Sequence, residues 1–158
     1  MPFIHHSRCP ISKVCDWEQI LNDSAGAKPD GLWFSIGDGT DWIALCKKRH
    51  VENGWCLDVL NCQTEIVFSE SANILHLASA EDIDTFTAAY VMNSSAMKID
   101  WRRVAEKFGG IIIAPHCDER SNHARTRWYY HWEVASCCVW RKSAVKCLRL
   151  LKHKHPRP

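Results

Sequence analysis

Two tryptophans flank a short polar turn in residues 31–46, which read GLWFSIGDGTDWIALC. The rings of Trp33 and Trp42 could sandwich a planar heteroaromatic ring, since offset stacking adds about 0.5–1.5 kcal/mol beyond the buried area. The turn between them would let the second ring close over a ligand, and Gly31 would permit a close backbone approach. The alternative is that both rings belong to the hydrophobic core.

A second group of polar residues stands near the start of the chain, in FIHHS at residues 3–7. The imidazole of His5 could donate a hydrogen bond to a ribose hydroxyl, and Ser7 could do the same beside it. The alternative is that histidines so close to a terminus are incidental. Together with the tryptophans, these residues predict a site for a nucleotide-like ligand.

A third candidate lies in residues 119–130, where arginines are interleaved with aromatic residues. Guanidinium groups bind phosphate through paired hydrogen bonds, and aromatic rings stack on bases. A solvated loop pinned to the core by its aromatic residues would have the same composition. The pattern indicates a patch for an acceptor or a pyrophosphate, made of Arg120, Arg125, Arg127, Trp128 and Tyr129.

The sequence offers little for a metal or for a standard nucleophile. His116, Cys117 and His123 could be part of a zinc site, but they lack a paired cysteine knuckle, and we expect no metal. Cys137 and Cys138 are neighbours on an expected strand, so their side chains point to opposite faces. The chain has no Gly-rich phosphate loop, no Gly-x-Ser-x-Gly elbow and no Cys-x-x-Cys pair.

The composition is that of a globular protein, with 158 residues, 46% hydrophobic residues and a net charge of +2. We expect one domain over residues 1–152, followed by a basic tail at residues 153–158. Nine cysteines, without a signal-like or membrane-spanning apolar run, favour a reducing compartment. We therefore expect a cytoplasmic protein, or a nuclear one in a eukaryote, with no membrane partner.

The pattern of apolar residues predicts an α+β fold with a mixed or mostly antiparallel sheet, because strands and helices do not alternate strictly. Thr40 or Asp41 would cap the second helix and Ser79 the third. The segment 142–152 is compatible with a helix or with extended chain. Strands are expected at residues 2–7, 31–36, 55–60, 64–69, 73–79, 111–115 and 136–140, and helices at 10–23, 40–51, 80–93 and 100–108.

Three short blocks resemble the ADP-ribosyltransferase superfamily, in its diphtheria-toxin and poly(ADP-ribose)-polymerase-like branch. They are FIHHS, GLWFS followed by DWIALC, and SCCVWRKSAVKCLRLL, and they cover about a quarter of the chain. His5 and Ser7 match the first block of the family, and Trp33 and Ser35 match the second. Two positions depart from the pattern: Leu45 replaces an aromatic residue, and Ser136 replaces the glutamate. Glu133, three residues earlier, is the carboxylate that could take over, and Trp42 could supply the missing ring.

The resemblance implies a fold of split β-sheets with flanking helices, and an enzyme that transfers ADP-ribose from NAD to a macromolecular acceptor with release of nicotinamide. NAD would be a substrate, and the acceptor would be nucleic acid or protein. Toxins, defence proteins and phage effectors are the settings that it suggests, with an antitoxin or inhibitor as a further partner. The catalytic residues would be Glu133, His5 and Ser136, and the NAD-binding residues would be His5, Ser7, Gly31, Trp33, Ser35 and Trp42.

Three other functions remain open from the sequence. The departure at Ser136 suits a module that binds NAD or ADP-ribose without catalysis. The basic end of the chain and the RTRWYY stretch at residues 125–130 suit a nucleic-acid-binding domain. A small metal-binding domain is the remaining alternative.

Overall fold

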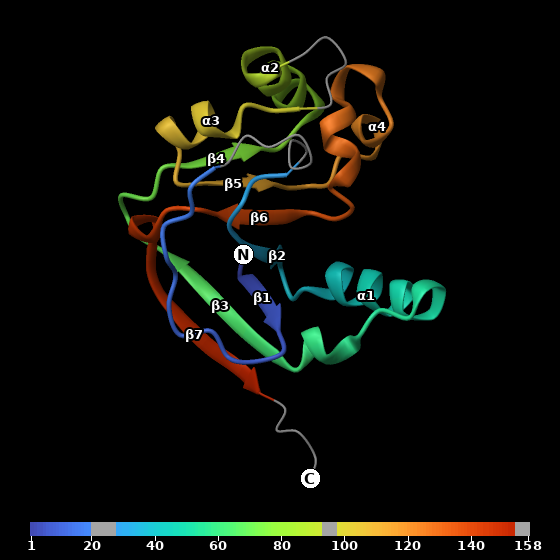
Figure 1. Cartoon of the computed structure of the whole chain (residues 1–158), viewed down its shortest axis with the longest axis vertical. Coiled ribbons are helices and arrows are strands. Elements are labelled where there is room, and N and C mark those ends of the chain that lie inside the picture. The colour runs from blue at the N-terminus through green and yellow to red at the C-terminus, as the bar shows by residue number, and fades with distance from the viewer. Residues whose placement is uncertain (20–27, 93–97, 154–158) are drawn as a thin grey trace.

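The computed structural model describes residues 1–19, 28–92 and 98–153. Its centre is a curled seven-stranded sheet in the order β4-β5-β6-β2-β1-β3-β7 (Figure 1). Strands β4 and β5 are parallel, and the other neighbouring pairs are antiparallel. The predicted mixed, mostly antiparallel sheet in a single domain is confirmed, but one continuous sheet replaces the split sheets that we expected. The strands are β1 (Phe3–Ser7), β2 (Leu32–Ile36), β3 (Cys62–Phe68), β4 (Ile74–Leu77), β5 (Gly110–Ile113), β6 (Ser136–Val139) and β7 (Val145–His153).

Helical segments lie beside both halves of the sheet. In Figure 1, α2 and α3 lie next to β4 and β5, whereas α1 extends outward from the region of β1 and β2. The segments are α1 (Thr40–Asn53), α2 (Ala80–Tyr90), α3 (Trp101–Lys107) and α4 (Asp118–Ser121), with the 3-10 helices η1 (Leu57–Leu60), η2 (Ala124–His131) and η3 (Lys142–Ala144).

The helices predicted at residues 40–51, 80–93 and 100–108 are confirmed, with small differences at their ends, and residue 93 lies outside the described ranges. The Ser79 hydroxyl accepts a hydrogen bond from the Asp82 amide at 3.1 Å, so this cap begins α2 as predicted. The cap of α1 was predicted wrongly. Gly39 takes that position in a left-handed conformation (φ 76°), and the Asp38 carboxylate accepts a hydrogen bond from the Thr40 amide at 2.9 Å.

Each face of the sheet is covered by its own hydrophobic core. The larger core joins the sheet to α2, α3 and η2 and includes Phe86, Tyr90, Trp101, Trp128, Tyr129, Trp132 and Trp140. The smaller core joins Ile66 of β3 to Phe34 of β2 and Val139 of β6 in one buried cluster, so it connects the two halves of the curled sheet. Cys138 belongs to the larger core and Cys137 to the smaller one, as the alternation along a strand requires.

The helix predicted at residues 10–23 is wrong for residues 10–19, which have no regular secondary structure, and residues 20–23 lie outside the described ranges. Tertiary hydrogen bonds hold this segment in another conformation. The Trp17 amide donates to the Trp140 carbonyl at 2.8 Å, and the Asp16 carboxylate accepts from the Lys142 amide at 2.8 Å. Residues 10–19 have the apolar spacing of a helix, but contacts with distant residues determine their conformation.

Three other segments differ from expectation or settle an open choice. The strand predicted at 55–60 is wrong: η1 occupies residues 57–60, and β3 begins at Cys62. No helix was predicted between the strands at residues 111–115 and 136–140, but α4 and η2 lie there. The segment after Ala144 is extended, since β7 pairs along β3, and it ends at His153.

Candidate functional site

A cleft of about 270 Å³ lies where β1, β2, α1 and the segment before β6 come together. Strands β1 and β2 are paired at Phe3↔Ile36 and Ile4↔Ser35, and the pairing goes no further. Beyond that point, side chains from both strands line an open space. We call this space the β1–β2 cleft, and its lining residues are Ile4, His5, His6, Lys28, Trp33, Phe34, Ser35, Trp42, Leu45, Glu133, Val134 and Ser136.

Most of the residues singled out in the sequence for NAD binding and catalysis line this one cleft. They come from three distant parts of the chain and are His5, Trp33, Ser35, Trp42, Glu133 and Ser136. Ser7 is not among the lining residues, and its hydroxyl donates to the Cys9 carbonyl at 2.7 Å. Gly31 is also outside the lining: a Cβ there would lie 2.6 Å from the Val139 carbonyl oxygen, so this glycine serves the close approach of β2 to β6.

A contact with the backbone decides which ring nitrogen of His5 carries the hydrogen. Its Nδ1 lies 2.7 Å from the carbonyl oxygen of Trp33, which can only accept, so Nδ1 carries the hydrogen. Burial lowers the pKa of His5, which favours the neutral ring. In the neutral ring Nε2 is then an acceptor. This corrects the expectation that the imidazole donates to a ribose hydroxyl, because the free nitrogen would accept from it instead.

His6 lines the cleft as well, although the sequence did not mark it as a binding residue. Both of its ring nitrogens are buried and have no hydrogen-bond partner within the described part of the chain. Burial lowers the pKa of His6, and the neighbouring His5 lowers it further. Gly39 closes over this ring, since a Cβ there would lie 2.6 Å from His6 Nε2 and 2.8 Å from Ser35 Oγ.

Lys28 places a cation against the aromatic wall of the cleft. Its Nζ lies 4.6 Å from the ring centroid of Trp33 and 5.8 Å from that of Trp132. The two indole rings are in contact, with centroids 4.8 Å apart. Burial lowers the pKa of Lys28, and Glu133 acts in the opposite direction. The cleft can therefore hold a cation over an aromatic face.

Glu133 is the carboxylate at the mouth of the cleft. Its Oε1 accepts a short hydrogen bond from the guanidinium of Arg49, and this contact raises the pKa of Arg49. The side chain of Glu133 is 37% exposed, so the pair is open to solvent. Arg49 was missed in the sequence. Its signal is the helical spacing from Trp42 through Leu45, which places all three on one face of α1.

The serines of the cleft are engaged in backbone contacts. The Ser35 hydroxyl donates to the Ile4 carbonyl at 2.9 Å, at the last paired position of β1 and β2. Ser136 pairs with Ser35 across β2 and β6, and its hydroxyl donates to the Val134 carbonyl at 3.1 Å. Both serine hydroxyls are therefore bonded to the backbone, and Glu133 is the carboxylate among the residues that line the cleft.

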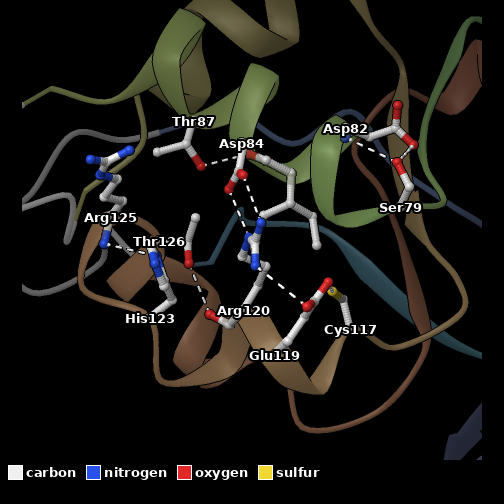
Figure 2. Close-up of polar contacts among 11 residues, drawn as sticks. Ser79, Asp82, Asp84, Thr87, Cys117, Glu119, Arg120, His123, Arg125 and Thr126 are labelled. Atoms are coloured by element: carbon white, nitrogen blue, oxygen red, sulfur yellow. Dashed lines mark hydrogen bonds and ion pairs between the residues drawn. The ribbon is translucent and has the colours of Figure 1, made fainter.

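The predicted acceptor patch is divided by the fold. Trp128 and Tyr129 are fully buried, so they offer no ring face to a base, and the patch lacks the two rings that the sequence assigned to it. Arg120 holds Asp84 of α2 through two hydrogen bonds of 2.8 and 2.9 Å, and Figure 2 shows its guanidinium between Asp84 and Glu119. Arg125 and Arg127 are exposed.

The residues considered for zinc have other contacts. His116 Nδ1 lies 2.9 Å from the Asp118 carboxylate, and its Nε2 is bonded to the Trp132 carbonyl. His123 Nδ1 accepts from the Arg125 amide at 3.3 Å. Over residues 1–19, 28–92 and 98–153, no group of three or more His, Cys, Asp or Glu side chains is arranged to hold a metal ion.

Comparison with known proteins gives no relative: no family model, curated protein or solved structure matches this chain. Within the described ranges, no helix has the length and apolar character needed to cross a membrane.

Proposed function

We propose that the protein transfers ADP-ribose from NAD to a macromolecular acceptor and releases nicotinamide. The observation that carries the proposal is the convergence of His5, Trp33 and Glu133 on one cleft. The three blocks that resemble the superfamily fall on β1, on β2 with α1, and on β6 with β7. The first two blocks and the start of the third contribute residues to the cleft.

The electrostatics of the cleft suit the nicotinamide end of NAD. The nicotinamide ring of NAD is a planar cation, and the cleft already holds the ammonium group of Lys28 over Trp33 at 4.6 Å. A volume of about 270 Å³ suits a nicotinamide ring with its ribose, while the rest of NAD would extend outside. Trp42 on α1 would close the second side of the ring.

Glu133 would act on the bond that breaks. Cleavage between nicotinamide and ribose develops positive charge on the sugar, and a fixed carboxylate nearby stabilises that charge. In the free protein Arg49 holds this carboxylate, so NAD has to enter beside an existing ion pair. His5 Nε2, left free by the bond from Nδ1 to Trp33, would accept a hydrogen bond from a ribose hydroxyl.

The test is incubation of the purified protein with NAD, followed by mass detection of free nicotinamide. Glu133→Gln keeps the size and one hydrogen-bonding oxygen but removes the charge, and we expect a loss of about 2–4 kcal/mol of transition-state stabilisation. Turnover would fall by roughly 30- to 1,000-fold, while NAD binding by calorimetry stays nearly unchanged. Glu52→Gln, on the exposed surface of α1, is the matched control and should keep full turnover.

Full turnover in Glu133→Gln would remove this residue from the mechanism. No nicotinamide from the wild-type protein, at any acceptor tested, would reject the proposed activity.

A second candidate function is a module that binds NAD or ADP-ribose without catalysis. The pairing of Glu133 with Arg49 favours it, because a neutralised carboxylate stabilises a developing cation poorly. The same calorimetry distinguishes the two functions: saturable binding of ADP-ribose with no release of nicotinamide from NAD supports the binding module.

A further inference from the structure

A second cavity lies on the segment that leads, along the chain, into Glu133. Its volume is about 290 Å³, and it is lined by Ser121, Asn122, Arg127, Tyr130 and His131. We call it the η2 cavity. His131 stands two residues before Glu133, and Tyr130 is, after Glu133 and Glu52, one of the groups that raise the pKa of Arg49. In Figure 1 the α4–η2 segment and α1 extend to the same side of the sheet.

Arg127 gives this cavity an unused cation. Its side chain is exposed, and no ion pair or hydrogen bond holds the guanidinium within the described part of the chain. Other arginines nearby are engaged: Arg49 with Glu133, and Arg120 with Asp84. A free guanidinium presents paired donors that match the oxygens of a phosphate.

Tyr130 gives the cavity an exposed aromatic face. It is 60% exposed, whereas Trp128, Tyr129 and Trp132 on either side of it are buried. The Trp128 indole also donates to the Thr87 hydroxyl at 2.8 Å, and Tyr129 packs against His116 with centroids 5.4 Å apart. Since its neighbours anchor the segment in the core, Tyr130 is held outward on a rigid base. A fixed, solvent-facing ring is a platform on which a nucleic-acid base can stack.

We propose that the η2 cavity is the acceptor subsite for single-stranded nucleic acid, with Tyr130 stacking on a base and Arg127 binding an adjacent phosphate. This inference rests on the proposed ADP-ribosyl transfer and names its acceptor. Asn122 and Ser121 add donors and acceptors for a base edge. A ring and an unpaired guanidinium in one cavity suit a base with its phosphate better than a protein side chain, which offers one or the other.

The proposed transfer breaks one bond, forms one bond and moves one proton. The bond between the ribose carbon and the nicotinamide nitrogen breaks, and nicotinamide leaves with the electron pair. A lone pair on a nitrogen of the stacked base forms the new bond to that carbon. The proton carried by this nitrogen passes to the Glu133 carboxylate and from there to water.

The test uses fluorescently labelled single-stranded oligonucleotides of mixed sequence, with binding followed by anisotropy at several salt concentrations. We expect Tyr130→Ala to weaken binding about tenfold, and Tyr130→Phe to bind like the wild type, because the ring is what stacks. Arg127→Gln should weaken binding and reduce the slope of log K against log salt by about 1. Arg102→Gln, an exposed arginine on α3, changes the net charge equally and should leave the binding unchanged.

Release of nicotinamide from NAD without oligonucleotide separates this inference from the proposed function. It should be unaffected by the control variant Arg102→Gln and strongly reduced by Glu133→Gln. If the oligonucleotide data follow the variants but no nicotinamide forms, the nucleic-acid site stands and the proposed catalysis fails. The inference is overturned if oligonucleotides do not bind, if Tyr130→Ala binds them like the wild type, or if radiolabelled NAD marks only proteins in a nuclease-treated lysate.

Discussion

At the residue scale, Lys28 and Glu133 line the β1–β2 cleft, and Arg49 contacts Glu133 from beside it. Arg49 is bonded to Glu133, whereas Lys28 stands over Trp33. A pyridinium ring that stacks on Trp33 would take the place of the Lys28 ammonium, so the two compete for one aromatic face. Burial disfavours the charged form of Lys28 in that position, which lowers the cost of displacing it.

Replacement of Lys28 by methionine removes the charge and keeps the length of the side chain. We expect NAD affinity to rise several-fold, since a cation–π contact of about 0.5–2 kcal/mol would no longer have to be broken. Calorimetric titration with NAD measures the change. Lys48→Met on the exposed side of α1 is the control and should leave affinity unchanged. A lower affinity in Lys28→Met would mean that Lys28 holds the ligand instead of competing with it.

At the scale of elements, the start of α1 is fitted against β1 and β2. Gly39 has a positive φ of 76° and lies against His6 and Ser35. This contact sets how closely Trp42 and Arg49 approach the cleft, because all of α1 follows from that turn. Gly54, at the other end of the helix, has φ 69° and no neighbour within 4 Å of an added Cβ.

The two glycines give a matched test of this contact. Gly54→Ala should lower the free energy of unfolding by about 1–2 kcal/mol, the cost of a left-handed alanine. Gly39→Ala carries the same cost and adds overpacking against His6, about 1–3 kcal/mol more. Urea unfolding of both variants measures the difference. Equal losses would show that the space beside His6 is not limiting.

The elements also show what the sequence can and cannot predict. The helices at 40–51, 80–93 and 100–108 follow from local periodicity and, for α2, from the Ser79 cap, so they could be predicted. The segment 10–19 could not, since its conformation depends on bonds to Trp140 and Lys142. The 3-10 winding of η2 decides that Tyr129 is buried and Tyr130 exposed, and no periodicity in RTRWYY distinguishes them.

The same limit applies to the candidate site. The blocks that resemble a known superfamily identified His5, Trp33, Trp42 and Glu133 as candidates for one site, and they line one cleft. Lys28 could not be found in this way, because it reaches the cleft from a loop with no pattern of its own. Gly31 was assigned to the ligand because the sequence cannot show that β6 lies against it.

At the scale of the whole molecule, two partly buried histidines couple the cleft to stability. Burial lowers the pKa of both His5 and His6 below the ordinary value of about 6.5. The charged groups around them in the cleft are Lys28 and Glu133. In the unfolded chain both imidazoles are solvated and titrate near their ordinary value.

Stability should therefore depend on pH in a defined direction. As the pH falls below about 6.5, the unfolded chain binds more protons at these histidines than the folded protein does, so the free energy of unfolding decreases. Above that pH both states are neutral and this contribution is fully present. Urea unfolding across the range measures the slope, and His6→Gln should make it shallower. A free energy of unfolding that does not fall on mild acidification, or a slope unchanged in His6→Gln, would contradict this.

The adjacent cysteines of β6 divide the interior between them. Cys137 faces the smaller core and Cys138 the larger one, and burial raises the pKa of both thiols. Neither can form a reactive thiolate until its own side of the sheet opens. A thiol reagent that modifies only one of these two neighbouring cysteines would therefore show which half of the molecule opens first.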